Sequence, residues 1–290
     1  MLFDKEHYLS DIAKFKCLID RAEAIVIGAG PDFSGDIERQ YSTMEFNINT
    51  LINTLSIDTL GCLNDLILGR PSFIHSLEEY WLFWAEAILE RRYENPPEPS
   101  YKKLLKLVKD KNYFVVTTNI FNSFQRAGFE NKRLFCAHGD EGRFQCSAAC
   151  HNKTYDNEEF LRKIAIQQPH LEDISKIMPC CPICGSPMVV NTRYYYNFIK
   201  DNEWQVAHKR YETFINENKD KRILFIELCV GNTTPIISKY SFSYITATNP
   251  KAHYVNICVD FSNYFIPYEI RERALSFSYA SQVITDILEY

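Results

Sequence analysis

The chain has 290 residues, of which 46% are apolar and 14% aromatic, and this is enough for one substantial core and a smaller module. Its net charge is −5, from 37 acidic and 32 basic residues, and no run of like charges provides the basic surface that nucleic-acid phosphates require. The first residues are too rich in charges for a signal peptide, and no apolar run approaches the roughly 20 residues that span a bilayer. We therefore expect a cytoplasmic protein that binds neither nucleic acid nor membranes, in a compartment that keeps its ten cysteines reduced.

The first hundred residues predict a helix, a strand and a helical insertion. Apolar side chains recur at helical spacing over residues 5–21, and a short apolar run at 24–27 leads into Gly28-Ala29-Gly30. Residues 31–98 are expected to form a mobile loop and a helical insertion. Its amphipathic helix, LEEYWLFWAEAILERRY, follows Ser76 and ends before the Asn-Pro-Pro run at 95–97.

The rest of the chain alternates between helices and strands. A helix over 100–110 precedes YFVVTT, a buried parallel strand that ends at Asn119. Later segments predict a helix at 202–217, strands at 222–230 and 252–259, and a last helix after Pro267. This order predicts an α/β fold with a Rossmann-like, doubly wound parallel sheet, built from residues 1–30, 99–141 and 194–290. Ligands of such sheets bind beyond the carboxyl ends of the strands.

Residues 142–193 differ in composition and contain two close pairs of cysteines, Cys146 with Cys150 and Cys181 with Cys184. Four thiolates in two pairs are typical of a tetrahedral structural zinc site, so we expect a small four-cysteine zinc-binding module here. Cys180 is an alternative to Cys181. Free thiols or a disulfide are the other interpretation, which a reducing compartment disfavours.

Two glycine turns follow predicted strands. At Gly28-Ala29-Gly30, glycine lets the backbone approach a ligand while amides point at phosphate oxygens. The third glycine of the usual dinucleotide pattern is absent, so a plain tight turn fits this segment equally well. The second turn, Gly231-Asn232-Thr233, favours ligand binding.

A histidine turn, His138-Gly139-Asp140, lies between Asn119 and the first cysteine pair, and we expect it in the cleft between the two modules. An imidazole with a pKa near ~6.5 can act as a general base at neutral pH, and the adjacent glycine would leave room for a ligand. The alternative is a histidine that is hydrogen-bonded into a turn.

These motifs occur in the order found in sirtuins, and the chain resembles that family. The segments QCSAACHNKTYDNEEF, CPICGSPMVVNTR, SLEEYWLFWAE and IELCVGNTTPIISKYSF are similar to class M sirtuins, the macrodomain-linked group of microbes. The resemblance implies that NAD binds across the cleft, loses nicotinamide, and gives its ADP-ribose to a protein acceptor such as a lipoyl-carrier protein. A macrodomain hydrolase is then an expected partner.

The resemblance also implies roles for individual residues. His138, Asn119 and Arg193 correspond to catalytic positions, with Arg193 near the acceptor, and the four paired cysteines hold zinc. The expected cofactor contacts are Gly28, Ala29, Gly30, Ser34, Thr118, Asn119, Gly231, Asn232, Thr233 and Asn256.

Several residues depart from the family pattern. Class M proteins generally have glutamine where this chain has His138, whereas lysine-deacylating sirtuins have histidine. Phe121 replaces an aspartate of the nicotinamide pocket, and Pro31 removes an amide from the cofactor loop. Cys258 is an alternative to Asn256. NAD-dependent lysine deacylation and a catalytically weak NAD- or ADP-ribose-binding protein are therefore alternatives to the transferase.

Overall fold

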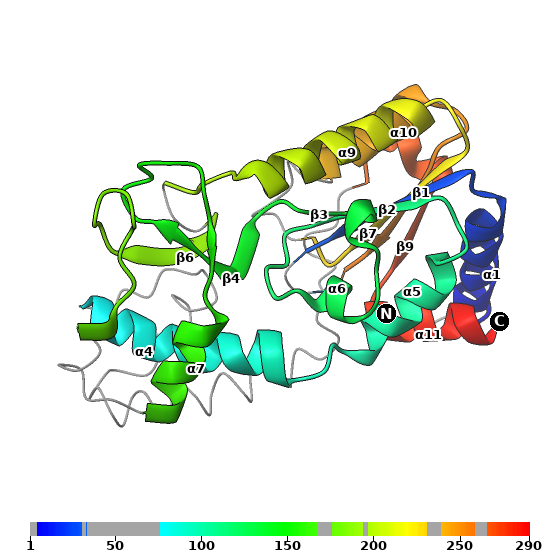
Figure 1. Ribbon diagram of the computed structural model, residues 1–290. Coiled ribbons are helices and arrows are strands. Elements are labelled where there is room, and N and C mark those ends of the chain that lie inside the picture. The colour runs from blue at the N-terminus through cyan, green and yellow to red at the C-terminus, as the bar shows by residue number, and fades with distance from the viewer. Residues whose placement is uncertain are drawn as a thin grey trace.

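The computed structural model describes residues 5–30, 33, 76–167, 176–193, 197–230, 239–258 and 266–290. Its larger part is a six-stranded sheet in the order β3-β2-β1-β7-β8-β9, and every neighbouring pair is parallel (Figure 1). The six strands are β1 (Ala24–Ala29), β2 (Tyr113–Thr117), β3 (Leu134–Cys136), β7 (Ile223–Leu228), β8 (His253–Ile257) and β9 (Ala274–Phe277).

Helices cover both faces of this sheet. One face packs against α1 (Lys5–Arg21), α5 (Pro99–Val108) and α11 (Ala280–Glu289), and the other packs against α9 (Asn202–Asn218) and α10 (Lys239–Thr248) (Figure 1). Successive side chains of a strand point to opposite faces. Accordingly, Ile25 and Ile27 enter the first core, whereas Ala24 and Val26 enter the second. The predicted doubly wound, Rossmann-like fold is confirmed.

The strand order reverses at β1. The chain passes from β1 to β2 and β3 on one side, and β7, β8 and β9 extend the sheet on the other side. Ligands of such sheets bind at this switch point, outside the carboxyl ends of the strands. Gly30 lies there, directly after β1, and its amide donates to the carbonyl of Leu228 at 2.8 Å.

The smaller part of the molecule contains the antiparallel sheet β5-β4-β6, with β4 (Gly139–Cys146), β5 (Tyr155–Asp156) and β6 (Met188–Thr192). This sheet shares a core with α4 (Leu77–Ile88), the π-helix η1 (Leu89–Glu94) and α7 (Glu158–Gln167). We call this assembly the small lobe (Figure 1). The boundary predicted at residue 142 falls inside β4, and the described part of the helical insertion packs in the small lobe.

Some elements differ from the sequence prediction. β3 was not expected, and the segment after Pro267 forms a 3-10 helix, η4 (Tyr268–Arg273), and strand β9 before α11 begins. β1 extends two residues beyond the predicted apolar run, and the other predicted strands are present but one or two residues shorter at their ends. Among the described residues, no helix is long and apolar enough to cross a membrane.

The close approach of β1 to the segment after β7 requires glycine at position 30. An added Cβ would lie 1.9 Å from the carbonyl oxygen of Cys229, which is backbone and cannot swing away. We predict that Gly30→Ala lowers the free energy of unfolding by about 3 kcal/mol. In the control Gly185→Ala, the new Cβ meets nothing within 4 Å and only the φ of +73° opposes an alanine, so a loss of about 1 kcal/mol is expected.

Urea unfolding of both variants measures these losses as shifts of the midpoint at constant slope. Equal losses in the two variants would contradict the backbone clash.

Candidate functional site

The carboxyl ends of β1 and β2 are tied together by the carbonyl of Ala29. It accepts hydrogen bonds from the Thr117 hydroxyl at 2.9 Å and from the Thr118 amide at 3.0 Å. The Thr117 hydroxyl in turn accepts from the Asn119 amide at 3.0 Å. The glycine turn and the asparagine therefore lie at one edge of the sheet.

The Asn119 side chain is buried and held at both ends of its carboxamide. Its Nδ2 donates to the Tyr101 hydroxyl at 2.9 Å, and its Oδ1 accepts from the Phe121 amide at 2.8 Å. Burial raises the pKa of Tyr101, so its hydroxyl stays neutral. Tyr101 was not among the expected site residues, and the sequence analysis placed it only in a helix over residues 100–110.

Two of the buried polar atoms that have no hydrogen-bond partner among the described residues belong to expected cofactor residues. They are Thr118 Oγ1, just beyond β2, and Asn256 Oδ1 in β8. Asn256 lies level with Glu227 of β7, which is level with Gly28 of β1. A buried polar atom without a partner costs about 1–3 kcal/mol, so both atoms fit a polar ligand laid across the sheet edge. Of the two alternatives, this observation favours Asn256 over Cys258.

His138 leaves the same edge of the sheet as Asn119. Thr117 of β2 pairs with Cys136 of β3, and Asn119 and His138 each lie two residues further along these parallel strands. His138 is 8% exposed. Burial, together with the smaller effect of the Arg193 charge, lowers the pKa of its imidazole to about 4. The imidazole is therefore neutral at physiological pH.

Gly139, directly after His138, is required for a reason other than the one expected from the sequence. Gly139 has φ of +90°, and an added Cβ would lie 2.3 Å from the carbonyl oxygen of Asn191. Backbone conformation and the approach of β6 therefore require glycine here. The predicted space for a ligand does not explain this residue.

Arg193 reaches the site from the small lobe. It directly follows β6, and its amide donates to the carbonyl of His138 at 2.9 Å. Its side chain is exposed, and its charge acts on the imidazole. The pairing of β4 with β6 thus brings His138 and Arg193 together although they lie far apart in the sequence.

The four cysteines form a compact cluster in the small lobe. The Sγ atoms of Cys146, Cys150, Cys181 and Cys184 all lie within 4.8 Å of one another. Cys146 and Cys184 are 3.5 Å apart, and Cys150 and Cys181 are 3.6 Å apart. Zn–S bonds of about 2.3 Å in a tetrahedron place sulfur atoms about 3.8 Å apart, so the cluster fits a zinc ion. The thiol of the alternative, Cys180, is exposed and lies near the carbonyl of Met178 instead.

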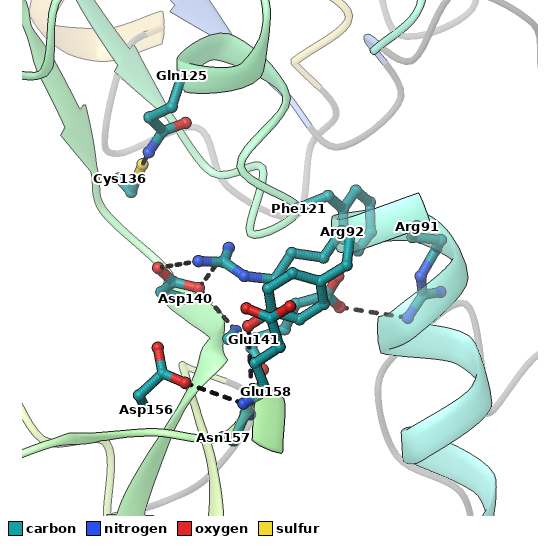
Figure 2. A network of polar contacts seen from close by, with 12 residues as sticks. Arg91, Arg92, Phe121, Gln125, Cys136, Asp140, Glu141, Asp156, Asn157 and Glu158 are labelled. Carbon is teal, nitrogen blue, oxygen red and sulfur yellow. Dashed lines mark hydrogen bonds and ion pairs between the residues drawn. The ribbon is translucent and has the colours of Figure 1, made fainter. Parts of the chain in front are cut away.

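A network of buried charges that the sequence analysis missed joins η1 to β4 (Figure 2). Arg92 pairs with both carboxylate oxygens of Asp140, at 2.7 and 3.1 Å, and Arg91 Nη2 lies 3.3 Å from Glu141 Oε2. Burial raises the pKa of Asp140 above its usual range and that of Glu141 to about 7. The adjacent Arg-Arg and Asp-Glu pairs were the only signal in the sequence.

Four expected cofactor residues, Ser34, Gly231, Asn232 and Thr233, lie outside the described residues, as does Pro31. Gly28, Ala29, Gly30, Thr118, Asn119 and Asn256 are described, and they belong to β1 or β8 or directly follow β1 or β2.

The cysteine cluster predicts about one zinc ion per chain, bound through Cys181. We expect Cys181→Ser to lose most of the zinc, because one of four ligands is removed, and Cys180→Ser to keep it. Metal analysis of freshly purified, reduced protein measures both contents. Retention of zinc by Cys181→Ser, or metal-free wild-type protein, would contradict the assignment. Chelation should also speed amide exchange between residues 139 and 192, since binding energy of structural zinc is folding energy.

The depressed pKa of His138 predicts that its imidazole titrates near pH 4 in NMR spectra of the folded chain. Arg193→Gln should raise the midpoint only partly toward the ordinary value near ~6.5, because burial is the larger cause. The stability that comes from this shift is present above about pH 6.5 and declines as the pH falls through 4, since folding favours the neutral ring. A wild-type midpoint near 6 would show that the ring is solvated.

No protein-family model matches the chain. A relative from Staphylococcus aureus, named "Protein ADP-ribosyltransferase", is 30% identical over 278 residues, which cover 95% of this chain and 85% of that protein. A solved structure of Sir2Tm bound to a propionylated peptide has a TM-score of 0.57 at 18% identity and covers 96% of this chain and 97% of that one. A Sir2 mutant solved with a p53 peptide and NAD has a TM-score of 0.59, also at 18% identity and with the same coverage.

Proposed function

The chain belongs to the sirtuin family, and on this premise we propose that it is an enzyme that transfers one ADP-ribosyl group from NAD to a protein acceptor. The observation that carries the proposal is the 30% identity, over 95% of the chain, to a relative named as a protein ADP-ribosyltransferase. The resemblance to class M sirtuins adds two finer proposals, which are a lipoyl-carrier protein as the acceptor and a macrodomain hydrolase as a partner.

The residues at the sheet edge fit NAD. When bound, NAD supplies the ADP-ribosyl group and nicotinamide leaves. The backbone of Gly28, Ala29 and Gly30 would approach its phosphates at the switch point. Thr118 Oγ1 and Asn256 Oδ1 would gain the hydrogen bonds that they lack among the described residues.

We propose that Asn119 and His138 orient the ribose next to the bond that breaks. Tyr101 and Phe121 hold the Asn119 carboxamide, so it presents one fixed direction. The imidazole of His138 is neutral at physiological pH and can accept a hydrogen bond from a hydroxyl group. With a pKa of about 4 it is a weak base, which suits orientation and polarisation of a hydroxyl better than complete removal of its proton.

Arg193 and the zinc module would act from the small lobe. The exposed guanidinium of Arg193 lies where an acceptor protein can approach, and it would attract an anionic group on that protein. The zinc ion would have no part in the chemistry. It would fix the end of β4 and β6 that is remote from His138, since Cys146 pairs with Met188 at that end.

Lysine deacylation is the second candidate function, and His138 favours it. Ordinary sirtuins have histidine at this position, whereas class M proteins generally have glutamine. In that reaction His138 would deprotonate a ribose hydroxyl, which requires a stronger base than the buried imidazole of the free chain.

Incubation of the chain with labelled NAD separates the two functions. We expect label on a lipoylated carrier protein and release of nicotinamide, whereas an acetyl-lysine peptide would yield O-acyl-ADP-ribose if the chain is a deacylase. Asn119→Ala and His138→Ala should lower nicotinamide release about 100-fold, as expected when a positioned group is removed at the reacting centre. His7→Ala is the control, because that side chain is 73% exposed on α1.

Binding of NAD without release of nicotinamide from the wild-type chain would refute both enzymatic functions and favour the NAD-binding protein.

A further inference from the structure

The π-helix η1 places two neighbouring arginines against β4. Its turn is wide, since the amide of Asn95 donates to the carbonyl of Glu90, five residues earlier, at 2.9 Å. Such turns are rare and occur frequently at functional sites. Arg91 and Arg92 both direct their guanidinium groups from this helix to the acidic pair after Gly139 (Figure 2).

The side chain of Arg91 contacts two segments outside its own helix. Its Nη2 lies 3.3 Å from Glu141, and its Cζ lies 4.7 Å from the ring centre of Phe121. The side chain is 17% exposed and that of Glu141 is fully buried. A guanidinium on an aromatic face in such surroundings holds a fixed place, because its plane and its charge both contribute to the contact.

Each of these two contacts lies next to a proposed catalytic residue. The amide of Phe121 is the donor that holds Asn119 Oδ1, at 2.8 Å. Glu141 lies three residues after His138, and its amide donates to the carbonyl of Ile120 at 3.3 Å. The loop that carries Asn119 and the strand that follows His138 therefore meet at Arg91.

We infer that Arg91 is a positioning residue that fixes the Asn119 loop and the His138 strand relative to each other. For its effect on catalysis this inference rests on the function proposed above. The family motifs named above give no role to Arg91. Its guanidinium holds Phe121, the residue that replaces the aspartate expected at that position. Through this contact, the phenylalanine anchors the Asn119 loop to the small lobe.

Arg92 provides a matched control. It is the next residue of the same helix, and it also makes an ion pair with β4, with a side chain that is 11% exposed. In the described part of the chain it pairs with Asp140 and lies over the Tyr93 ring. A role that is only structural would make the two arginines equivalent, whereas positioning of the Asn119 loop singles out Arg91.

Steady-state kinetics tests the catalytic part. Arg91→Gln should lower kcat at least about 10-fold while KM for NAD changes less than about threefold, because a small misplacement of reacting groups is costly. Arg92→Gln should lower kcat less than about threefold. Arg91→Lys keeps the charge but loses the planar stacking group, so an intermediate kcat is expected.

The double variant Arg91→Gln/Glu141→Gln separates positioning from folding. It leaves no buried carboxylate unpaired, so it should regain the thermal stability that Arg91→Gln loses. Its kcat should stay low, since the contact with Phe121 is still absent. Recovery of kcat together with stability would overturn the inference.

Amide hydrogen exchange tests the positioning part without any activity. In Arg91→Gln, the Phe121 and Glu141 amides should exchange at least about 10-fold faster, since both hydrogen bonds depend on the anchored loop. In Arg92→Gln, the amide that should respond is that of Gly142, which donates to Asp140 at 2.7 Å. Unchanged exchange at Phe121 and Glu141 in Arg91→Gln would overturn the inference. Failure of the wild-type chain to release nicotinamide would instead refute the proposed function. The exchange rates would still show whether Arg91 fixes the Asn119 loop and the His138 strand relative to each other.

Discussion

The antiparallel pairing of β4 with β6 is the constraint on which the candidate site depends. At one end of this ladder Gly139 pairs with Thr192, which sets the backbone of His138 beside Arg193. At the other end Cys146 pairs with Met188, next to the cysteine cluster. The parallel sheet supplies the edge and Asn119, but the second half of the site is positioned from the small lobe. A change in this ladder therefore alters the site even when the large core is intact.

Burial decides the charges around this edge. The imidazole of His138 is kept neutral, whereas burial raises the pKa values of Asp140 and Glu141 against the opposing charges of the arginines of η1. The site thus combines one uncharged polar ring with ion pairs that hold the backbone beside it. Truncation of one member of such a pair is costly because the other charge stays buried.

The sequence predicts the features that local patterns encode. Apolar runs predict β1 and β2, helical spacing predicts α1 and α9, and paired cysteines predict the cluster, because spacing determines which thiols can share an ion. β3 and β9 are too short to show a periodic pattern. The contact of Arg91 with Glu141 joins residues 50 positions apart, and the reason for Gly139 depends on the approach of Asn191. Such tertiary contacts leave no local signal.

All described elements of the small lobe precede the second half of the parallel sheet in the chain. Its described elements run from α4 to β6 and end at Thr192, whereas the large sheet requires β7, β8 and β9, the last of which ends at Phe277. During synthesis, all described segments of the lobe are therefore made before β7, the strand that pairs with β1 on one side. Because domains generally fold as units during synthesis, we expect the metal-binding lobe to fold before the parallel sheet is complete. A shortage of zinc would then affect the protein before its nucleotide-binding sheet exists.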